Sequence, residues 1–123
     1  MKTSNFKSYK GKDGIAICLF PPLNWVGPSF IKLAPDKDTF FKKKTNQITE
    51  KEYEQRYKTN TLSKLDPQNI YDELKDKVLL CYEEPIEFCH RFLVAKWIKE
   101  ELNIEVSEWK PSDEIKNNIN PLF

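Results

Sequence analysis

Two short apolar runs constrain the fold of this chain more than any other feature. They are GIAICLF at residues 14–20 and KVLLCY at residues 77–82, and each is followed within a few residues by proline. In both runs consecutive residues are apolar, so a strand formed there would be apolar on both of its faces. This is typical of strands in a sheet that is covered on both sides. We therefore predict that both runs are buried strands.

Helical patterns occupy the segments between and after these runs. Residues 49–58 begin with a threonine and an acidic first turn, which predicts a helix with Tyr53 and Tyr57 on one face. Residues 66–76 begin with Asp-Pro, a typical helix start, and continue with apolar residues at helical spacing. Residues 86–102 carry a wide apolar stripe, so we predict a long and largely buried third helix there.

The NIEVSEW segment predicts one more strand, with Ile104 and Val106 on one face. Alternating strands and helices predict an α/β fold, in a single small domain with a mainly parallel sheet and flanking helices. We assign residues 1–110 to that domain and residues 111–123 to a polar C-terminal tail. In such sheets, ligands bind where a strand ends and the next helix begins.

The charge and hydropathy of the chain exclude several classes of protein. The formal net charge is +1 over 123 residues, which provides no overall field for attracting nucleic acid or an anionic membrane. Prolines interrupt the apolar segment IAICLFPPLNWV, so no membrane span is predicted. The N-terminal residues lack the apolar core of a secretion signal. We therefore expect a cytoplasmic protein without membrane contact.

The loop at residues 21–35 contains four prolines and a glycine, which predict irregular structure. Its aromatic residues Trp25 and Phe30 are expected to pack over the core. Cys18, Cys81 and Cys89 are odd in number and lie in or beside apolar stretches. This usage favours reduced thiols and argues against a disulfide framework.

The chemically richest stretch of the chain is LLCYEEPIEFCHR at residues 79–91, which combines two cysteines with the single histidine. Cys81 ends a predicted strand, and its simplest interpretation is a small buried core residue. Cys89 falls near the start of the predicted helix, where the helix dipole lowers the pKa of a thiol. Because successive helical residues diverge by about 100°, Cys89, His90 and Arg91 cannot all face one small ligand. We expect Cys89 to face inward and the other two to face the strand-end cleft.

Glu83 is placed to pair with Arg91 or to orient His90, and a purely structural salt bridge is an equal alternative. Cys81 and His90 are the easiest thiol and base to bring together across the turn. The cluster could donate three metal ligands, but it lacks a paired C-x-x-C spacing and a fourth ligand. The glycines match no phosphate-binding loop. We therefore predict no metal and no cofactor.

The strings LLCYEEPIEFCHRFLVAKWI, TLSKLDPQNIYDEL and IKLAP together resemble the bacterial and phage-type members of domain-of-unknown-function family 488. The resemblance implies a small α/β domain with a site at the Cys-His-Arg motif, and no settled reaction. It also implies that Ser4 and Asn5 lie near the same cleft, at the end of a first strand. Tyr53 and Tyr57 would come from a helix that covers it.

These observations lead to one main hypothesis, a site for a small anionic or nucleotide-like ligand with an uncertain enzymatic activity. The candidate catalytic residues are Cys81, Glu83 and His90. The candidate ligand-binding residues are Arg91, Cys89, Ser4, Asn5, Tyr53 and Tyr57.

Two alternatives from other classes remain open. The segment FFKKKTNQ at residues 40–47 has aromatic rings beside lysines, as in single-strand nucleic-acid contacts, although three consecutive lysines are more commonly a solvated turn. The second alternative is a phage-type interaction protein that sequesters a ligand or binds a host partner without catalysis. The sequence does not predict an oligomeric state.

Overall fold

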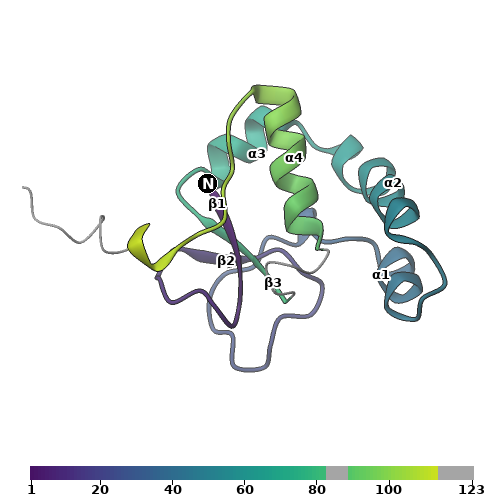
Figure 1. The fold of residues 1–123 in the computed structure, drawn as a ribbon, viewed down its shortest axis with the longest axis horizontal. Coiled ribbons are helices and arrows are strands. Elements are labelled where there is room, and N and C mark those ends of the chain that lie inside the picture. Colours follow the sequence, from purple (N-terminus) through teal and green to yellow (C-terminus); the bar gives the residue numbers. More distant parts are fainter. Residues whose placement is uncertain (83–88, 114–123) are drawn as a thin grey trace, which may run out of the picture.

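A computed structural model describes residues 1–82 and 89–113 of the chain. Its centre is a three-stranded sheet built from β1 (Lys2–Asn5), β2 (Gly14–Ala16) and β3 (Val78–Cys81). The strand order is β1-β3-β2, and both neighbours run parallel to β3. This arrangement confirms the predicted α/β fold with a parallel sheet, as Figure 1 shows.

The helices pack beside the sheet, with α3 and α4 together over one side of it and α1 paired with α2 (Figure 1). In the described part of the chain the α-helices are α1 (Lys37–Lys44), α2 (Glu50–Asn60), α3 (Pro67–Leu74) and α4 (His90–Leu102). The short 3-10 helix η1 (Ile31–Leu33) precedes α1, and a second one, η2 (Leu62–Lys64), lies between α2 and α3.

The predicted helix starts are confirmed at α2 and α3. Thr49 and Glu52 form a reciprocal capping box at the start of α2. The Asp66 side chain accepts a hydrogen bond from the backbone N–H of Gln68, and Pro67 occupies the first turn of α3. These caps satisfy N–H groups that a helix cannot pair internally, so local sequence alone locates the start of each of these two helices.

Side chains of β3 alternate between two apolar clusters. Leu79 joins the larger cluster, which contains residues of α2, α3 and α4. Val78 and Leu80 point the other way and pack with Tyr9 and Trp109, while Trp25 covers that cluster from the long loop. Because side chains alternate along a strand, Cys81 faces the same side as Leu79, toward the helices.

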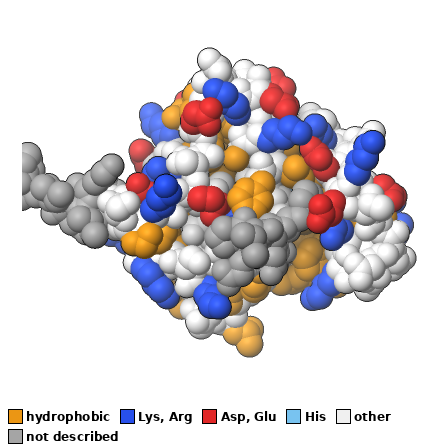
Figure 2. All heavy atoms as spheres, in the orientation of Figure 1, with side chains coloured by type: hydrophobic (Ala, Val, Ile, Leu, Met, Phe, Trp, Pro, Cys, Tyr) orange, Lys and Arg blue, Asp and Glu red, His pale blue; other side chains and the backbone are white. Residues whose placement is uncertain are grey.

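The expected packing of the proline-rich loop is confirmed. Trp25 packs against the smaller cluster and Phe30 against the larger one. Acidic and basic side chains are interspersed on the face shown in Figure 2, which agrees with a net charge near zero. Within the described residues, none of the helices has the length and apolar character that a membrane crossing needs.

Two strand predictions were wrong in extent. The run at residues 14–20 forms a strand only over Gly14–Ala16, because its partner β3 ends at Cys81. The NIEVSEW segment makes a single parallel bridge, between Glu108 and Thr3, although Ile104 and Val106 do pack on the core. Strands β1 and β2 are the two edges of the sheet, and β1 pairs with β3 along its full length.

Helix predictions also need two corrections. Helix α1 was missed, although Asp36 caps it by accepting a hydrogen bond from Thr39. The lysines at residues 42–44 therefore belong to the last helical turn. Helix α4 begins at His90 and not at Ile86, since Cys89 has an extended backbone. Residues 86–88, like the tail beyond Asp113, lie outside the described residues.

Candidate functional site: a sulfur pair between a strand end and a helix start

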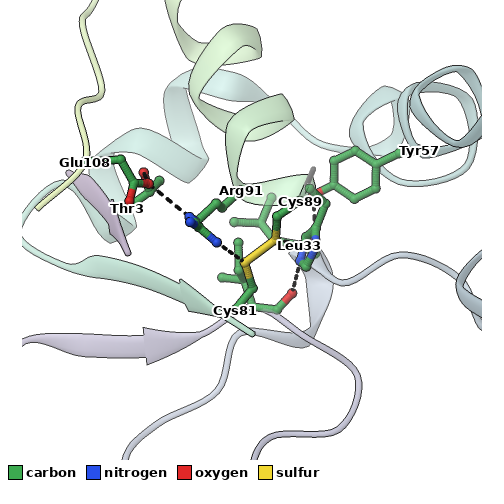
Figure 3. Close-up of a disulfide and its surroundings, with 9 residues drawn as sticks. Thr3, Leu33, Tyr57, Cys81, Cys89, Arg91 and Glu108 are labelled. Atoms are coloured by element: carbon green, nitrogen blue, oxygen red, sulfur yellow. Dashed lines mark hydrogen bonds and ion pairs between the residues drawn. A yellow bond between two sulfur atoms is a disulfide. The ribbon is translucent and has the colours of Figure 1, made fainter. Parts of the chain in front are cut away.

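A disulfide between Cys81 and Cys89 forms the centre of the candidate site (Figure 3). Cys81 is the last residue of β3, and Cys89 is the residue that precedes the first turn of α4. Both side chains are buried. The expectation of reduced thiols is therefore wrong for this pair, because the fold places the strand end opposite the helix start. Cys18, also buried, takes no part in the disulfide.

Arg91 approaches the pair from the first turn of α4. Its Nη1 donates a hydrogen bond to Cys81 Sγ over 2.9 Å, and its Nε donates to Glu108 Oε1 over 2.9 Å. The side chain is 0% exposed and its guanidinium also lies 4.4 Å from the ring centroid of Phe92. A buried cation is therefore aimed at one sulfur and held there by a carboxylate.

Glu108 is a site residue that the sequence did not reveal. Thr3 in β1 donates a hydrogen bond from Oγ1 to the same Oε1 atom, over 2.6 Å. Backbone hydrogen bonds from Thr3 to Ser107 and from Trp109 to Thr3 fix the segment beside β1. The available signal was alternation, since Glu108 follows Ile104 and Val106 at spacings of two on the inward face.

His90 lies beside the other sulfur of the pair, Cys89 Sγ. Its Nε2 lies 2.6 Å from the carbonyl oxygen of Ile17, so Nε2 carries the hydrogen and donates it. The other nitrogen, Nδ1, therefore presents a lone pair, and it lies 3.7 Å from Cys89 Sγ. Burial, reinforced by the charge of Arg91, lowers the pKa of His90 to about 4 despite the hydrogen bond to Ile17. The ring is consequently neutral at neutral pH.

His90 and Arg91 do not face an open cleft, contrary to expectation. Their exposed fractions are 6% and 0%, and each makes a hydrogen bond to a protein partner. Both can be buried because one is neutral and the other is paired with Glu108. The expected inward position of Cys89 is confirmed. Glu83, the predicted partner of these two residues, lies outside the described residues.

The N-terminal strand reaches the site through Asn5, as the family resemblance implied, whereas the same expectation is wrong for Ser4. Asn5 is in register with Cys81 on the neighbouring strand, and Ser4 is in register with Leu80. Because parallel neighbours in register share a face, Asn5 lies on the sulfur side of the sheet and Ser4 on the other. Asn5 is 0% exposed, and its Nδ2 has no hydrogen-bond partner among the residues that the structure describes.

The two tyrosines of α2 form one buried stack with ring centroids 6.3 Å apart. The Tyr57 ring lies edge-on to the His90 ring, at 5.6 Å, while its hydroxyl donates to the carbonyl of Leu33. Tyr57 therefore contacts the site directly, and Tyr53 stacks on Tyr57. This agrees with the expectation that α2 covers the site.

The arrangement combines groups with distinct chemical capacities. The sulfurs of Cys81 and Cys89 and a ring nitrogen of His90 all lie within 4.8 Å of one another. Such sulfurs can cycle between a disulfide and two thiols, and in the reduced form they are nucleophiles and soft metal ligands. Arg91 supplies positive charge at the sulfur that would carry negative charge after reduction.

Comparison with known proteins identifies the family of the chain. The profile of the family described as "Active DUF488-N3 subclade" matches residues 23–102, which is more than half of the sequence. No curated protein and no solved structure matches the chain significantly. The matched region contains β3, both cysteines of the disulfide and the whole of α4. The chain therefore belongs to domain-of-unknown-function family 488, within this subclade.

Proposed function

We propose that this protein is a thiol-dependent enzyme that reduces a small anionic molecule, with nucleotide-like molecules as the first class to test. The observation that carries the proposal is the covalent Cys81–Cys89 pair, flanked by Arg91 and His90 at the carboxyl end of the central strand. The description of the subclade as active also favours an enzyme. On this proposal the protein works in the cytoplasm, where cellular thiols regenerate the reduced pair.

The reaction proceeds in two sulfur-centred steps. The Cys81 thiolate attacks an electrophilic atom of the substrate and forms a covalent adduct, while one bonding electron pair of that atom passes to its neighbour, which takes up a proton or leaves as water. The Cys89 thiolate then attacks Cys81 Sγ, which forms the disulfide and releases the substrate with the bonding electron pair and a proton. The substrate is thereby reduced by two electrons, and a dithiol reductant restores the two cysteines while becoming a disulfide itself.

The surroundings of the sulfurs support these roles. Arg91 Nη1, 2.9 Å from Cys81 Sγ, stabilises negative charge on that sulfur. Neutral His90 presents Nδ1 to Cys89 Sγ at 3.7 Å and accepts a hydrogen bond from that thiol. The positive end of α4 lies beside the pair, and the Cys89 side chain does not cap it. Together these groups favour an anionic substrate over a cationic one.

Multiple-turnover assays test the proposal. Reduced protein is incubated with a panel of nucleotides and inorganic oxyanions, with excess dithiothreitol as the reductant. We expect at least one substrate to yield more than one equivalent of reduced product per chain, and Cys81→Ser to abolish it. Cys18→Ser is the matched control and retains turnover. A panel member that binds and returns unchanged would instead indicate a sequestering protein.

One observation favours a second candidate function, binding of single-stranded nucleic acid. Phe20, Phe40 and Phe41 form an aromatic cluster, in which Phe20 and Phe41 are about half exposed, beside the lysines of α1. Lys42 is paired with Asp38, which weakens the positive field of this surface. Binding that falls steeply with salt and is lost in Lys43→Ala with Phe41→Ala would support this function. Binding that is indifferent to both changes would exclude it.

A further inference from the structure

We infer that the reduced form of the Cys81–Cys89 pair, together with His90, is a binding site for a thiophilic divalent cation, with Zn²⁺ as the best fit. The ligand atoms are Cys81 Sγ, Cys89 Sγ and His90 Nδ1, and all three residues are buried. This inference rests on the reduction of the pair that the proposed function requires. It goes beyond that function because a metal site needs no substrate.

The distances suit a tetrahedral zinc. Zn–S bonds of about 2.3 Å and Zn–N bonds of about 2.0 Å place neighbouring ligand atoms roughly 3.5 to 3.8 Å apart. Cys89 Sγ and His90 Nδ1 are already 3.7 Å apart. The Cα atoms of Cys81 and Cys89 are 7.4 Å apart, so the two sulfurs can separate after reduction without movement of the backbone.

His90 has the protonation pattern of a metal ligand. Its Nε2 donates to the carbonyl oxygen of Ile17 over 2.6 Å, which fixes the hydrogen on the nitrogen that points away from the sulfurs. A backbone carbonyl in this role orients the ring of many metal-binding histidines. The edge-on ring of Tyr57 restricts rotation further. Nδ1 is thus held ready as a donor by groups outside the sulfur pair.

Metal binding requires both cysteines in the thiolate form, and a bound cation balances their charge. In the reduced site, two thiolates carry two negative charges, and Arg91 is already compensated by Glu108. Two buried thiolates without a cation would be expensive in free energy, whereas Zn²⁺ neutralises both. The hydrogen bond from Arg91 Nη1 to Cys81 Sγ can persist in the metal-bound state. The described residues provide three ligands, so the fourth zinc position can take water or a small anion.

The metal and the disulfide exclude each other, so metal binding becomes sensitive to oxidants. Binding of Zn²⁺ to the two thiols releases two protons. A hydroperoxide then converts the thiolates to the disulfide, takes up two electrons and two protons, and leaves as an alcohol and water. The zinc ion is set free in that step. The structure with the bonded pair corresponds to the oxidised state of the site.

Cobalt binding tests the inference directly. Wild-type protein is reduced with a phosphine, freed of reductant and titrated with Co²⁺, while a second sample is kept oxidised. We expect one Co²⁺ per reduced chain, with a thiolate-to-cobalt charge-transfer band that one equivalent of Zn²⁺ removes. The oxidised sample should bind none. This comparison requires no substitution, so a failure to fold cannot obscure it.

Substitutions then identify the ligands. Cys89→Ser and His90→Gln should each weaken Zn²⁺ binding at least tenfold in competition with a chromophoric chelator, and Cys18→Ser should leave it unchanged. Equal binding by Cys18→Ser and Cys89→Ser, or a reduced wild-type protein without the charge-transfer band, would overturn the inference. A redox titration in the presence of a chelator separates the two proposals. A pair that reduces reversibly but binds no metal contradicts only the metal site.

Discussion

The two sulfurs of the disulfide meet opposite surroundings. Cys81 contacts the charged Arg91, which a second side chain, Glu108, holds in place. Cys89 contacts the neutral His90, which a backbone carbonyl holds in place. A charge that depends on a side chain can be removed by one substitution, whereas an orientation that depends on backbone cannot. Substitution should therefore destabilise the protein mainly through the Cys81 side, and protonation should destabilise it mainly through the Cys89 side.

The largest effect is expected from removing the partner of Arg91. Glu108→Ala removes the carboxylate that pairs with Nε of a fully buried guanidinium, which should lower the free energy of unfolding by about 4 kcal/mol. Chemical denaturation measures it. The matched control is Glu105→Ala, because Glu105 forms an ion pair of the same length, 2.9 Å, with Lys99 but is 80% exposed. That substitution should change stability by at most about 0.5 kcal/mol. Equal effects would abolish the distinction between the two sides.

Acidification should act on the Cys89 side. His90 has a folded pKa of about 4, below the value near 6.5 of an unfolded histidine, so the unfolded chain binds the proton first. Its contribution to stability is therefore complete above about pH 6.5 and is lost as the pH falls toward 4, by about 3 kcal/mol. Unfolding of the oxidised, metal-free protein across this range measures the loss. His90→Gln should flatten the slope, and an unchanged slope would contradict a buried neutral ring.

Reduction should affect both sides together. The disulfide closes a loop with a sequence separation of 8, so opening it in the presence of a chelator should lower stability by about 2.5 kcal/mol. Thermal denaturation of the oxidised and reduced samples measures the change. Zn²⁺ added to the reduced sample should restore stability, since on our inference it binds the folded form more tightly than the unfolded chain. No recovery would argue that the two sulfurs act separately once the bond is broken.

The smallest effect is expected at the outer end of the charged side. Thr3→Val removes the hydroxyl that donates to Glu108, a change of about 1 kcal/mol in unfolding free energy. Ser107→Ala is the neighbouring control, because its hydroxyl accepts from the exposed Lys2 ammonium. The loss in Thr3→Val should disappear in a Glu108→Ala background. An additive loss would show that Thr3 acts independently of the ion pair.

Local patterns predicted the parts of this molecule that depend on neighbouring residues. The caps at Thr49 and Asp66 and the buried strand ending at Cys81 were predictable, because each depends on a few adjacent residues. The location of the candidate site followed from the general rule for parallel sheets. The start of α4 was predicted too early, because apolar residues before Cys89 continue the helical spacing in the sequence, whereas the helix begins at His90.

The partners within the site could not be predicted in the same way. Glu108 follows Arg91 by 17 residues, and only the run of backbone beside β1 brings the two together. The disulfide depends on the distance between a strand end and a helix start, which no spacing in the sequence encodes. The burial of His90 depends on the carbonyl of Ile17, 73 residues away in the chain. Tertiary packing decides all three contacts.

Reversible two-electron cycling of Cys81 and Cys89 is the central claim, and one redox titration tests it most directly. Protein carrying Cys18→Ser is equilibrated with mixtures of reduced and oxidised dithiothreitol in the presence of a chelator. Free thiols are then trapped with a maleimide, and the number of maleimides per chain is determined by mass spectrometry. The account predicts a single reversible transition from no maleimide to two per chain, while the protein stays folded. A chain that carries two maleimides, or none, at every ratio of the two forms would contradict it.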